Sequence, residues 1–320
     1  MYHGARMGPV RIRLIPVVVV ASLAIAGALM IVGGIHDDST DAIIVPPETA
    51  PPVATTASRP VSEFAIAPDG RRLAFSAVDE SGTRQLWLRS LLQADDRPLP
   101  RTEDAAHPFW SSDSRFVAYF AGGALLKIAA EGGVPTMIGP AAAASSGGAW
   151  HGDVILFGAG PLYRIAAGGG TAVPVTVLRD GETAHSHPVF LPDGRRFLYT
   201  VTQADGATRI DLGSLDSPER QHVLSDASGV ALGDGYIVYI RNRALHVQPF
   251  DVGLLTPRGD PIRVSDGAPS EPGSDGVRAL SLSAAGILAY QRGPAVAPAA
   301  GEGKIDRPVT LVDWRSTAER

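Results

Sequence analysis

Cysteine is absent from the 320-residue sequence. The chain can therefore form no disulfide, no cysteine-ligated zinc site and no thiol nucleophile. The fold must be held together by the packing of apolar side chains and by hydrogen bonds between strands. Hydrophobic residues make up 45% of the sequence, which is enough for a globular core.

Several catalytic motifs are absent as well. The sequence has no Gly-rich loop combined with His-Arg-Asp and Asp-Phe-Gly, so phosphoryl transfer of the protein-kinase type cannot be assigned. It also has no Gly-x-Ser-x-Gly pentapeptide, which argues against a serine hydrolase of the α/β type. No catalytic residue is assigned from motifs.

Charge is modest and spread along the chain. The formal net charge is −5, and removing the three positive charges of Arg6, Arg11 and Arg13 leaves −8 for the rest. An acidic chain without a block of like charge argues against nucleic acid as a partner.

One long apolar run does occur, near the N-terminus. Residues 14–35 are 22 uncharged residues, and as a helix they would extend about 33 Å, enough to cross a membrane. Arginines precede the run and aspartates follow it, so the positive-inside rule places residues 1–13 in the cytoplasm as a short basic tail. We expect a single-pass protein of the inner (cytoplasmic) membrane whose main body lies in the periplasm or extracytoplasmic space.

A cleaved signal peptide is the alternative for this segment. Ala26-Gly27-Ala28 is an acceptable cleavage site, but Leu29 to Val32 continue the apolar run and favour a membrane anchor. With either interpretation the body of the protein is exported. Residues 36–61 form a linker, rich in proline between Pro46 and Pro60, with one short β-prone run at 42–45.

A repeat dominates the rest of the chain. Three copies are evident, at Phe64–Phe75, Phe109–Tyr119 and Val189–Tyr199. Their turn residues Asp69 and Asp113 are 44 positions apart, and Asp193 follows 80 positions later, which leaves room for a weaker copy. A period of about 40 residues made of short β runs and Gly-rich turns is typical of a β-propeller blade.

The predicted fold is all-β, a six-bladed β-propeller at 62–320 preceded by one N-terminal transmembrane helix. The six predicted blades are 62–102, 106–139, 147–178, 185–224, 228–264 and 278–314. The sixth contains three strands, so residues 42–45 are expected to pair with it as the outer strand and close the ring.

Local chemistry supports the repeat. In Pro68-Asp69-Gly70 the proline presets φ, the aspartate can accept hydrogen bonds from the following amides, and the glycine can adopt the left-handed conformation. Trp110 and Trp150 occupy matching positions, which favours packing between blades over ligand stacking.

The Pro-Asp turns at Pro68-Asp69 and Pro192-Asp193 resemble the PD40 or TolB-like propeller repeat. The segments 62–120 and 189–220 are similar to the extracytoplasmic region of certain bacterial transmembrane serine/threonine kinases, in which a propeller follows a membrane helix. The resemblance implies a sensor role. It suggests that this chain is a shortened or detached sensor half, and the alternative is a complete six-bladed ring.

Histidines recur at one place in the repeat. Glu63, His107 and His187 each lie six residues before the turn aspartate, near the expected mouth of the central channel, and His185 lies two residues from His187 on the same side of a strand. Such a group could bind a divalent metal ion. The favoured interpretation is structural, with each histidine bonded to the backbone of a neighbouring blade. We assign no metal or cofactor, and propose these four residues only as a ligand-binding channel mouth.

Two functions follow. The leading one is a non-catalytic, membrane-anchored propeller that binds an envelope protein or peptide as a sensor or scaffold. The second is a propeller enzyme of the lactonase or dehydrogenase type with a metal at the channel mouth. A calcium ion in the channel is not favoured, because the six matching positions supply one carboxylate. These positions are Glu63, His107, Gly147, His187, Ser228 and Ala279.

Overall fold

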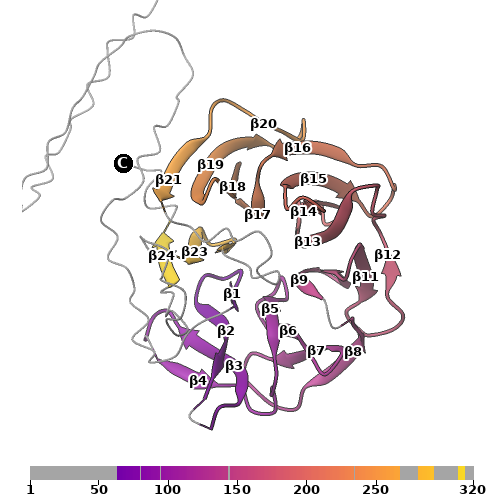
Figure 1. Cartoon of the computed structure of the whole chain (residues 1–320). Helices are drawn as coiled ribbons and strands as arrows, with labels where there is room; N and C mark the ends of the chain where they lie inside the picture. The colour runs from indigo at the N-terminus through magenta and orange to yellow at the C-terminus, as the bar shows by residue number, and fades with distance from the viewer. Residues whose placement is uncertain are drawn as a thin grey trace, which may run out of the picture. The chain divides into compact units, whose positions relative to one another are not determined.

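The computed structural model describes residues 63–79, 81–93, 95–142, 145–233, 235–266, 280–291 and 309–313. The chain divides into two units, Met1–Ala42 and Ile43–Arg320, and every described residue belongs to the second. All regular secondary structure of the described residues is β-strand (Figure 1).

Five sheets have four or more strands, and they follow one another along the chain. The first contains β1 (Glu63–Ile66), β2 (Arg72–Val78), β3 (Arg84–Ser90) and β4 (Asp96–Pro98). The second contains β5 (Ala106–Trp110), β6 (Phe116–Ala121), β7 (Ala124–Ala129) and β8 (Thr136–Pro140). The third contains β9 (Ser146–His151), β10 (Val154–Gly158), β11 (Leu162–Ala166) and β12 (Val173–Pro174). The fourth contains β13 (Glu182–Phe190), β14 (Arg196–Gln203), β15 (Thr208–Ser214) and β16 (Gln221–Ser225).

The fifth sheet is larger and the last is smaller. The fifth contains β17 (Ser228–Gly233), β18 (Tyr236–Arg241), β19 (Ala244–Asp251), β20 (Thr256–Pro257) and β21 (Ile262–Asp266). Both β20 and β21 pair with β19, at its two ends. The last sheet contains β22 (Leu280–Leu282), β23 (Ile287–Gln291) and β24 (Val309–Asp313).

The predicted fold class is therefore corrected in two respects. The structure shows five complete blades, not six, because the last sheet has three strands within the described residues. The strand at 42–45 that was expected to complete it lies outside them. The predicted transmembrane helix at 14–35 also lies outside the described residues, and no helix within them is long and apolar enough to span a membrane.

The sheets succeed one another around an axis. Their first strands contact each other in the order β1, β5, β9, β13, β17 and β22, and β22 in turn contacts β1 (Figure 1). This arrangement is a β-propeller in which the three-stranded sheet lies between the fifth blade and the first.

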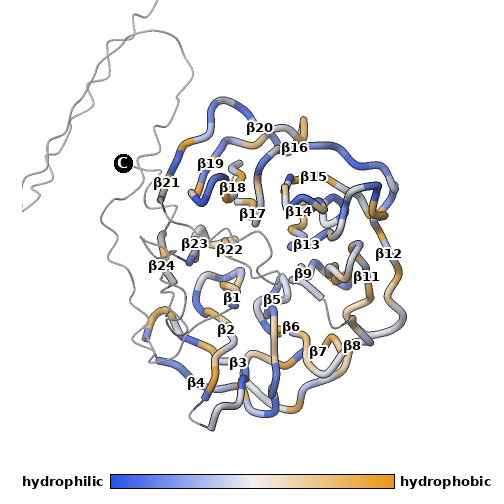
Figure 2. Tube along the Cα trace, in the orientation of Figure 1, coloured by the Kyte–Doolittle hydropathy of each residue, from blue (hydrophilic) through white to orange (hydrophobic). Residues whose placement is uncertain are grey.

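The hydrophobic core lies between successive sheets. Six clusters of buried side chains occur, and each is shared by two neighbouring sheets. Phe75 of the first blade, for example, packs in one cluster with Ala289 of the last sheet, and Tyr119 of the second blade packs in another with Leu86 of the first. Figure 2 shows the hydrophobic positions recurring within the strands of the blades. Burial of both faces of each sheet is the main stabilising contribution.

The turns between the first two strands behave as predicted. The side chains of Asp69, Asp113 and Asp193 each accept a hydrogen bond from the amide two residues later, at 2.9, 3.0 and 2.9 Å. The residue that follows each aspartate has positive φ: Gly70 (+70°), Ser114 (+59°) and Gly194 (+66°). At Gly194 a Cβ atom would lie 2.4 Å from the ring of His151, so glycine is required there for space as well as for conformation.

The packing role of the two tryptophans is confirmed. Trp110 is buried and its indole N–H donates to the carbonyl of Ala65 in the first blade, at 2.9 Å. Trp150 stacks on Phe116 of the second blade, with ring centroids 6.1 Å apart.

Candidate functional site

The inner strands of the second to fifth blades share a β-bulge. The pairing register shifts near the middle of β5, β9, β13 and β17, and one residue at each shift has positive φ. These residues are His107 (+49°), Gly147 (+64°), His187 (+49°) and Gly229 (+57°). A bulge re-aims a side chain and breaks the alternation of a strand.

The bulges correct the expected channel-mouth positions. His107, Gly147 and His187 are equivalent as predicted, but the fifth blade contributes Gly229 rather than Ser228. Glu63 lies in a regular part of β1, opposite Ser76 and without a bulge. Ala279 lies outside the described residues.

The structure brings Glu63 and His107 together. The buried Glu63 carboxylate accepts a hydrogen bond from the backbone N–H of His107, and its other oxygen lies 3.6 Å from Nδ1 of the same residue. The link therefore joins the first blade to the second, as the structural interpretation predicts. Its chemistry is the reverse of the expected one, because the histidine supplies the backbone group and the neighbouring blade supplies the side chain.

His187 makes a different contact. Its ring lies against Gly147, where an added Cβ would be 2.9 Å from Cδ2, and its Nδ1 is 3.2 Å from the hydroxyl of Ser186. The histidines of the mouth thus contact different neighbours. Within the described part of the chain no group of three or more histidine, aspartate or glutamate side chains could hold a metal ion.

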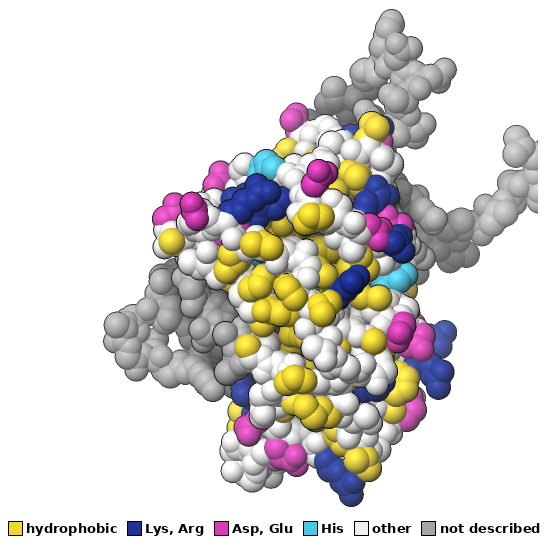
Figure 3. Space-filling view, turned by 90° about the vertical axis from the view of Figure 1, so that its right-hand side faces the viewer, with side chains coloured by type: hydrophobic (Ala, Val, Ile, Leu, Met, Phe, Trp, Pro, Cys, Tyr) yellow, Lys and Arg dark blue, Asp and Glu magenta, His cyan; other side chains and the backbone are white. Residues whose placement is uncertain are grey.

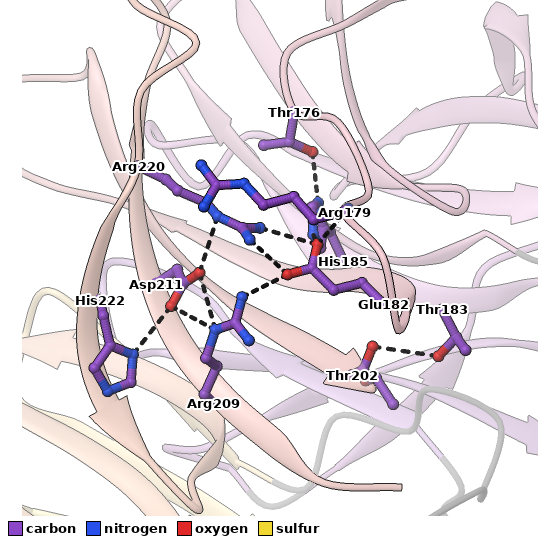
Figure 4. A network of polar contacts seen from close by, with 10 residues as sticks. All are labelled: Thr176, Arg179, Glu182, Thr183, His185, Thr202, Arg209, Asp211, Arg220 and His222. Atoms are coloured by element: carbon purple, nitrogen blue, oxygen red, sulfur yellow. Dashed lines mark hydrogen bonds and ion pairs between the residues drawn. The ribbon is translucent and has the colours of Figure 1, made fainter. Parts of the chain in front are cut away.

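His185 is not at the channel mouth. It is fully buried between the third and fourth blades, because the bulge at His187 breaks the alternation that would have placed both rings on one side. Its Nδ1 is 2.8 Å from the hydroxyl of Thr176 and its Nε2 is 3.2 Å from the carboxylate of Glu182 (Figure 4). Burial lowers the pKa of His185, although the hydrogen bond to Glu182 opposes this shift.

Glu182 is the centre of a polar network. Its carboxylate accepts two hydrogen bonds from the guanidinium of Arg220, at 2.5 and 3.0 Å, and one from Arg209 at 2.5 Å. The backbone N–H of Arg179 adds a fourth, at 2.8 Å. Burial alone would raise the pKa of Glu182, but these donors hold it well below its ordinary value.

A second buried carboxylate, Asp211, extends the network. It accepts a hydrogen bond from Nε of Arg209 at 3.0 Å, lies 3.5 Å from Nε of Arg220, and contacts the half-exposed His222 at 3.3 Å (Figure 4). Glu182 and Asp211 together balance the charges of Arg209 and Arg220. Because these residues come from β13, β15 and the segment before β16, the network braces the fourth blade internally and against the third.

The contacts of Thr176, His185 and Glu182 form a hydroxyl–imidazole–carboxylate chain, the order found in nucleophilic catalysis. Two features prevent that use. The hydroxyl oxygen of Thr176 already accepts the backbone N–H of Leu162 at 2.8 Å, and the Glu182 charge is balanced by two guanidinium groups. The imidazole between them has no exposed surface. The chain therefore serves as a structural connection between blades.

The sequence interpretation did not identify this network. One signal was present in β15, where Arg209 and Asp211 alternate with Ile210 and Leu212. Both faces of a central propeller strand are buried, so two charged residues on one face indicate a buried ionic cluster.

No family model matches the chain, and no curated protein matches it. Solved structures do. A protein of unknown function from Desulfotomaculum acetoxidans is 12% identical with a TM-score of 0.53, over 79% of this chain and 88% of that one. Oligogalacturonate lyase from Vibrio parahaemolyticus is 13% identical with a TM-score of 0.49, over 81% and 92%. TolB from Acinetobacter baumannii is 12% identical with a TM-score of 0.47, over 60% and 52%.

These likenesses concern the fold. They place the chain among β-propellers of the TolB type, in agreement with the Pro-Asp turns, and they provide no link to kinases. At such identities they do not transfer an activity or a site.

Proposed function

We propose that this protein is a non-catalytic binding module, a membrane-anchored extracytoplasmic β-propeller that recognises an envelope protein or peptide as a sensor or scaffold. The observation that carries the proposal is the state of the buried ionisable groups. Glu63, Glu182 and Asp211 are each engaged in contacts that hold strands and blades together, which leaves no poised acid, base or nucleophile at these places.

The partner is proposed to contact the channel mouth. Glu63, Phe64, His107, Pro108, Gly147 and Gly148 line a small depression there. The bulges of successive blades present their residues side by side at this level, so a peptide or loop that enters the mouth would meet several blades at once.

The enzyme alternative required a metal site at the channel mouth. Glu63 and His107 meet, but His187 contacts Gly147 and His185 lies in another interface. The ligands that this alternative needs are therefore not assembled, and it is not developed further.

Site-specific photo-crosslinking in cells tests the binding proposal. A photoreactive amino acid at position 107 reports on the mouth, and the same residue at Met137, an exposed position on β8, is the matched control. We expect a discrete adduct from position 107 and none from 137. Equal adducts from both positions, or metal-dependent turnover of lactones by the purified protein, would contradict the proposal.

The membrane anchor is tested separately. Because 14–35 follow a basic tail, alkaline phosphatase fused after residue 313 is expected to be active and a cytoplasmic fluorescent reporter at the same place to be dark. The reverse pattern would refute the proposed orientation.

A further inference from the structure

A pocket of about 240 Å³ lies between the third and fourth blades, next to the network of Glu182. Its walls come from the segment after β12, from β14 and β15, and from the segment before β16. It shares no lining residue with the channel mouth. Any ligand bound here would therefore be recognised independently of the proposed partner at the mouth.

Two arginines line this pocket, and they differ in their pairing. Arg220 uses two guanidinium N–H groups on Glu182, so donors remain on the same fork. The guanidinium of the exposed Arg179 has no hydrogen bond or ion pair to any described residue; only the backbone N–H of Arg179 is engaged. Because Glu182 and Asp211 balance Arg209 and Arg220, the charge of Arg179 is left without a partner.

A buried polar atom points to the same place. Tyr199 lines the pocket with none of its surface exposed, and its hydroxyl has no hydrogen-bond partner among the described residues. Burial is the main cause that raises the pKa of Tyr199 to about 12, so this hydroxyl is a neutral donor at pH 7. A buried donor without an acceptor is rare in folded proteins and requires an explanation.

The remaining walls limit the ligand. Val175 and Val177 provide apolar surface, and Figure 3 shows hydrophobic side chains gathered on the side of the molecule where β12 lies. Val177 is 74% exposed. The exposed Glu219 also lines the pocket and disfavours a ligand with two negative charges.

We propose that this pocket binds a single carboxylate carried on a small apolar body. The carboxylate oxygens accept hydrogen bonds from Arg179 and Arg220, the Tyr199 hydroxyl gains the acceptor it lacks, and the apolar body packs on the valines. The forked guanidinium matches a planar carboxylate, and one unbalanced positive charge matches one negative charge. A free carboxylic acid and the C-terminal residue of a peptide share this chemistry.

Isothermal titration of the purified protein tests the proposal with N-acetyl-leucine and N-acetyl-leucinamide, which differ in the charged group alone. We expect the acid to bind and the amide to bind at least tenfold more weakly. Arg179→Gln is expected to weaken binding of the acid about tenfold or more, since it removes a hydrogen bond to a charged group. Arg164→Gln is the matched control, because Arg164 is exposed on β11 and does not line the pocket, and it is expected to change affinity less than about twofold.

Tyr199→Phe separates a ligand contact from a packing role. The ring and its packing remain, so the free protein is expected to keep its melting temperature, while affinity for the acid falls about threefold to tenfold. A variant that loses stability but retains affinity would contradict the assignment of the hydroxyl.

The source of the carboxylate is distinguished by Ala-Ala-Leu and its C-terminal amide. A free tripeptide that binds more tightly than N-acetyl-leucine identifies a peptide C-terminus, and equal affinities identify a small acid; both outcomes support the carboxylate site. Equal binding of acid and amide, no binding, displacement by an equal concentration of inorganic phosphate, or equal effects of the changes at 179 and 164 would overturn it. None of these results depends on crosslinking at the channel mouth.

Discussion

Replacement of Glu182 by glutamine is the sharpest test of the network between the third and fourth blades. Glutamine keeps the shape of the side chain and removes its charge. The Glu182 side chain is 3% exposed and accepts hydrogen bonds from Arg209 and Arg220, so the change leaves two guanidinium groups with one buried carboxylate, Asp211.

The expected loss follows from that imbalance. Removal of one partner of a buried ion pair costs about 3–5 kcal/mol. The lower end applies here, because Asp211 still lies 3.0 Å from Arg209 and 3.5 Å from Arg220. A loss of about 3 kcal/mol in the free energy of unfolding corresponds to a decrease of about 6–12 °C in melting temperature for a domain of this size.

Urea denaturation and thermal melting at pH 7 measure the effect. Glu219→Gln is the control, since Glu219 is nearby and exposed, and its side chain makes no ion pair with a described residue. We expect the control to change the free energy of unfolding by less than about 0.5 kcal/mol.

The pH dependence sharpens the test. The pKa of Glu182 is lowered in the folded protein, so its contribution is fully present above the ordinary value of 4.5 and is lost as pH falls through the folded pKa. The difference between the wild type and the glutamine variant should be constant from pH 6 to 8 and should narrow below pH 4.5. Equal stability of the two glutamine variants, or a difference that does not narrow in acid, would refute the reasoning.

Three further changes are predicted. Gly194→Ala is expected to cost more than Gly206→Ala by at least about 1 kcal/mol in thermal melts, because both have positive φ but the former also meets the His151 ring; equal costs would contradict this. Burial makes folded His185 take up a proton less readily than the unfolded chain, whose pKa is near 6.5, so the wild type should lose stability as pH falls from 7 to 5.5 and His185→Gln should lose less; parallel profiles would disprove the assignment. His107→Gly should melt within a few degrees of the wild type while His107→Ile melts much lower, since the bulge needs a left-handed residue; the opposite order would refute the bulge.

Much of the fold was predictable because its signals are local. The turn aspartates and the residues after them set each hairpin by hydrogen bonds within four residues, and the repeat spacing then predicts the propeller. The number of complete blades was not predictable in this way. It depends on which strands pair across the ends of the domain, and such long-range pairing has no local signal.

The candidate site was predicted in part for the same reason. Counting from the turn aligned His107 with His187, but one extra residue in each inner strand sent His185 and His187 to different surroundings. The ionic network joins residues from several strands and loops, with separations of up to 38 residues, so no contiguous motif marks it.

The six apolar clusters are unequal, and the one between the third and fourth blades has the fewest buried apolar members in the described structure. A circular stack yields first at its weakest seam, and this seam relies on ionic contacts that acid and salt weaken. Mild acid should then convert the closed circle into an arc before general unfolding, with protease cutting first in the connecting segment 175–181.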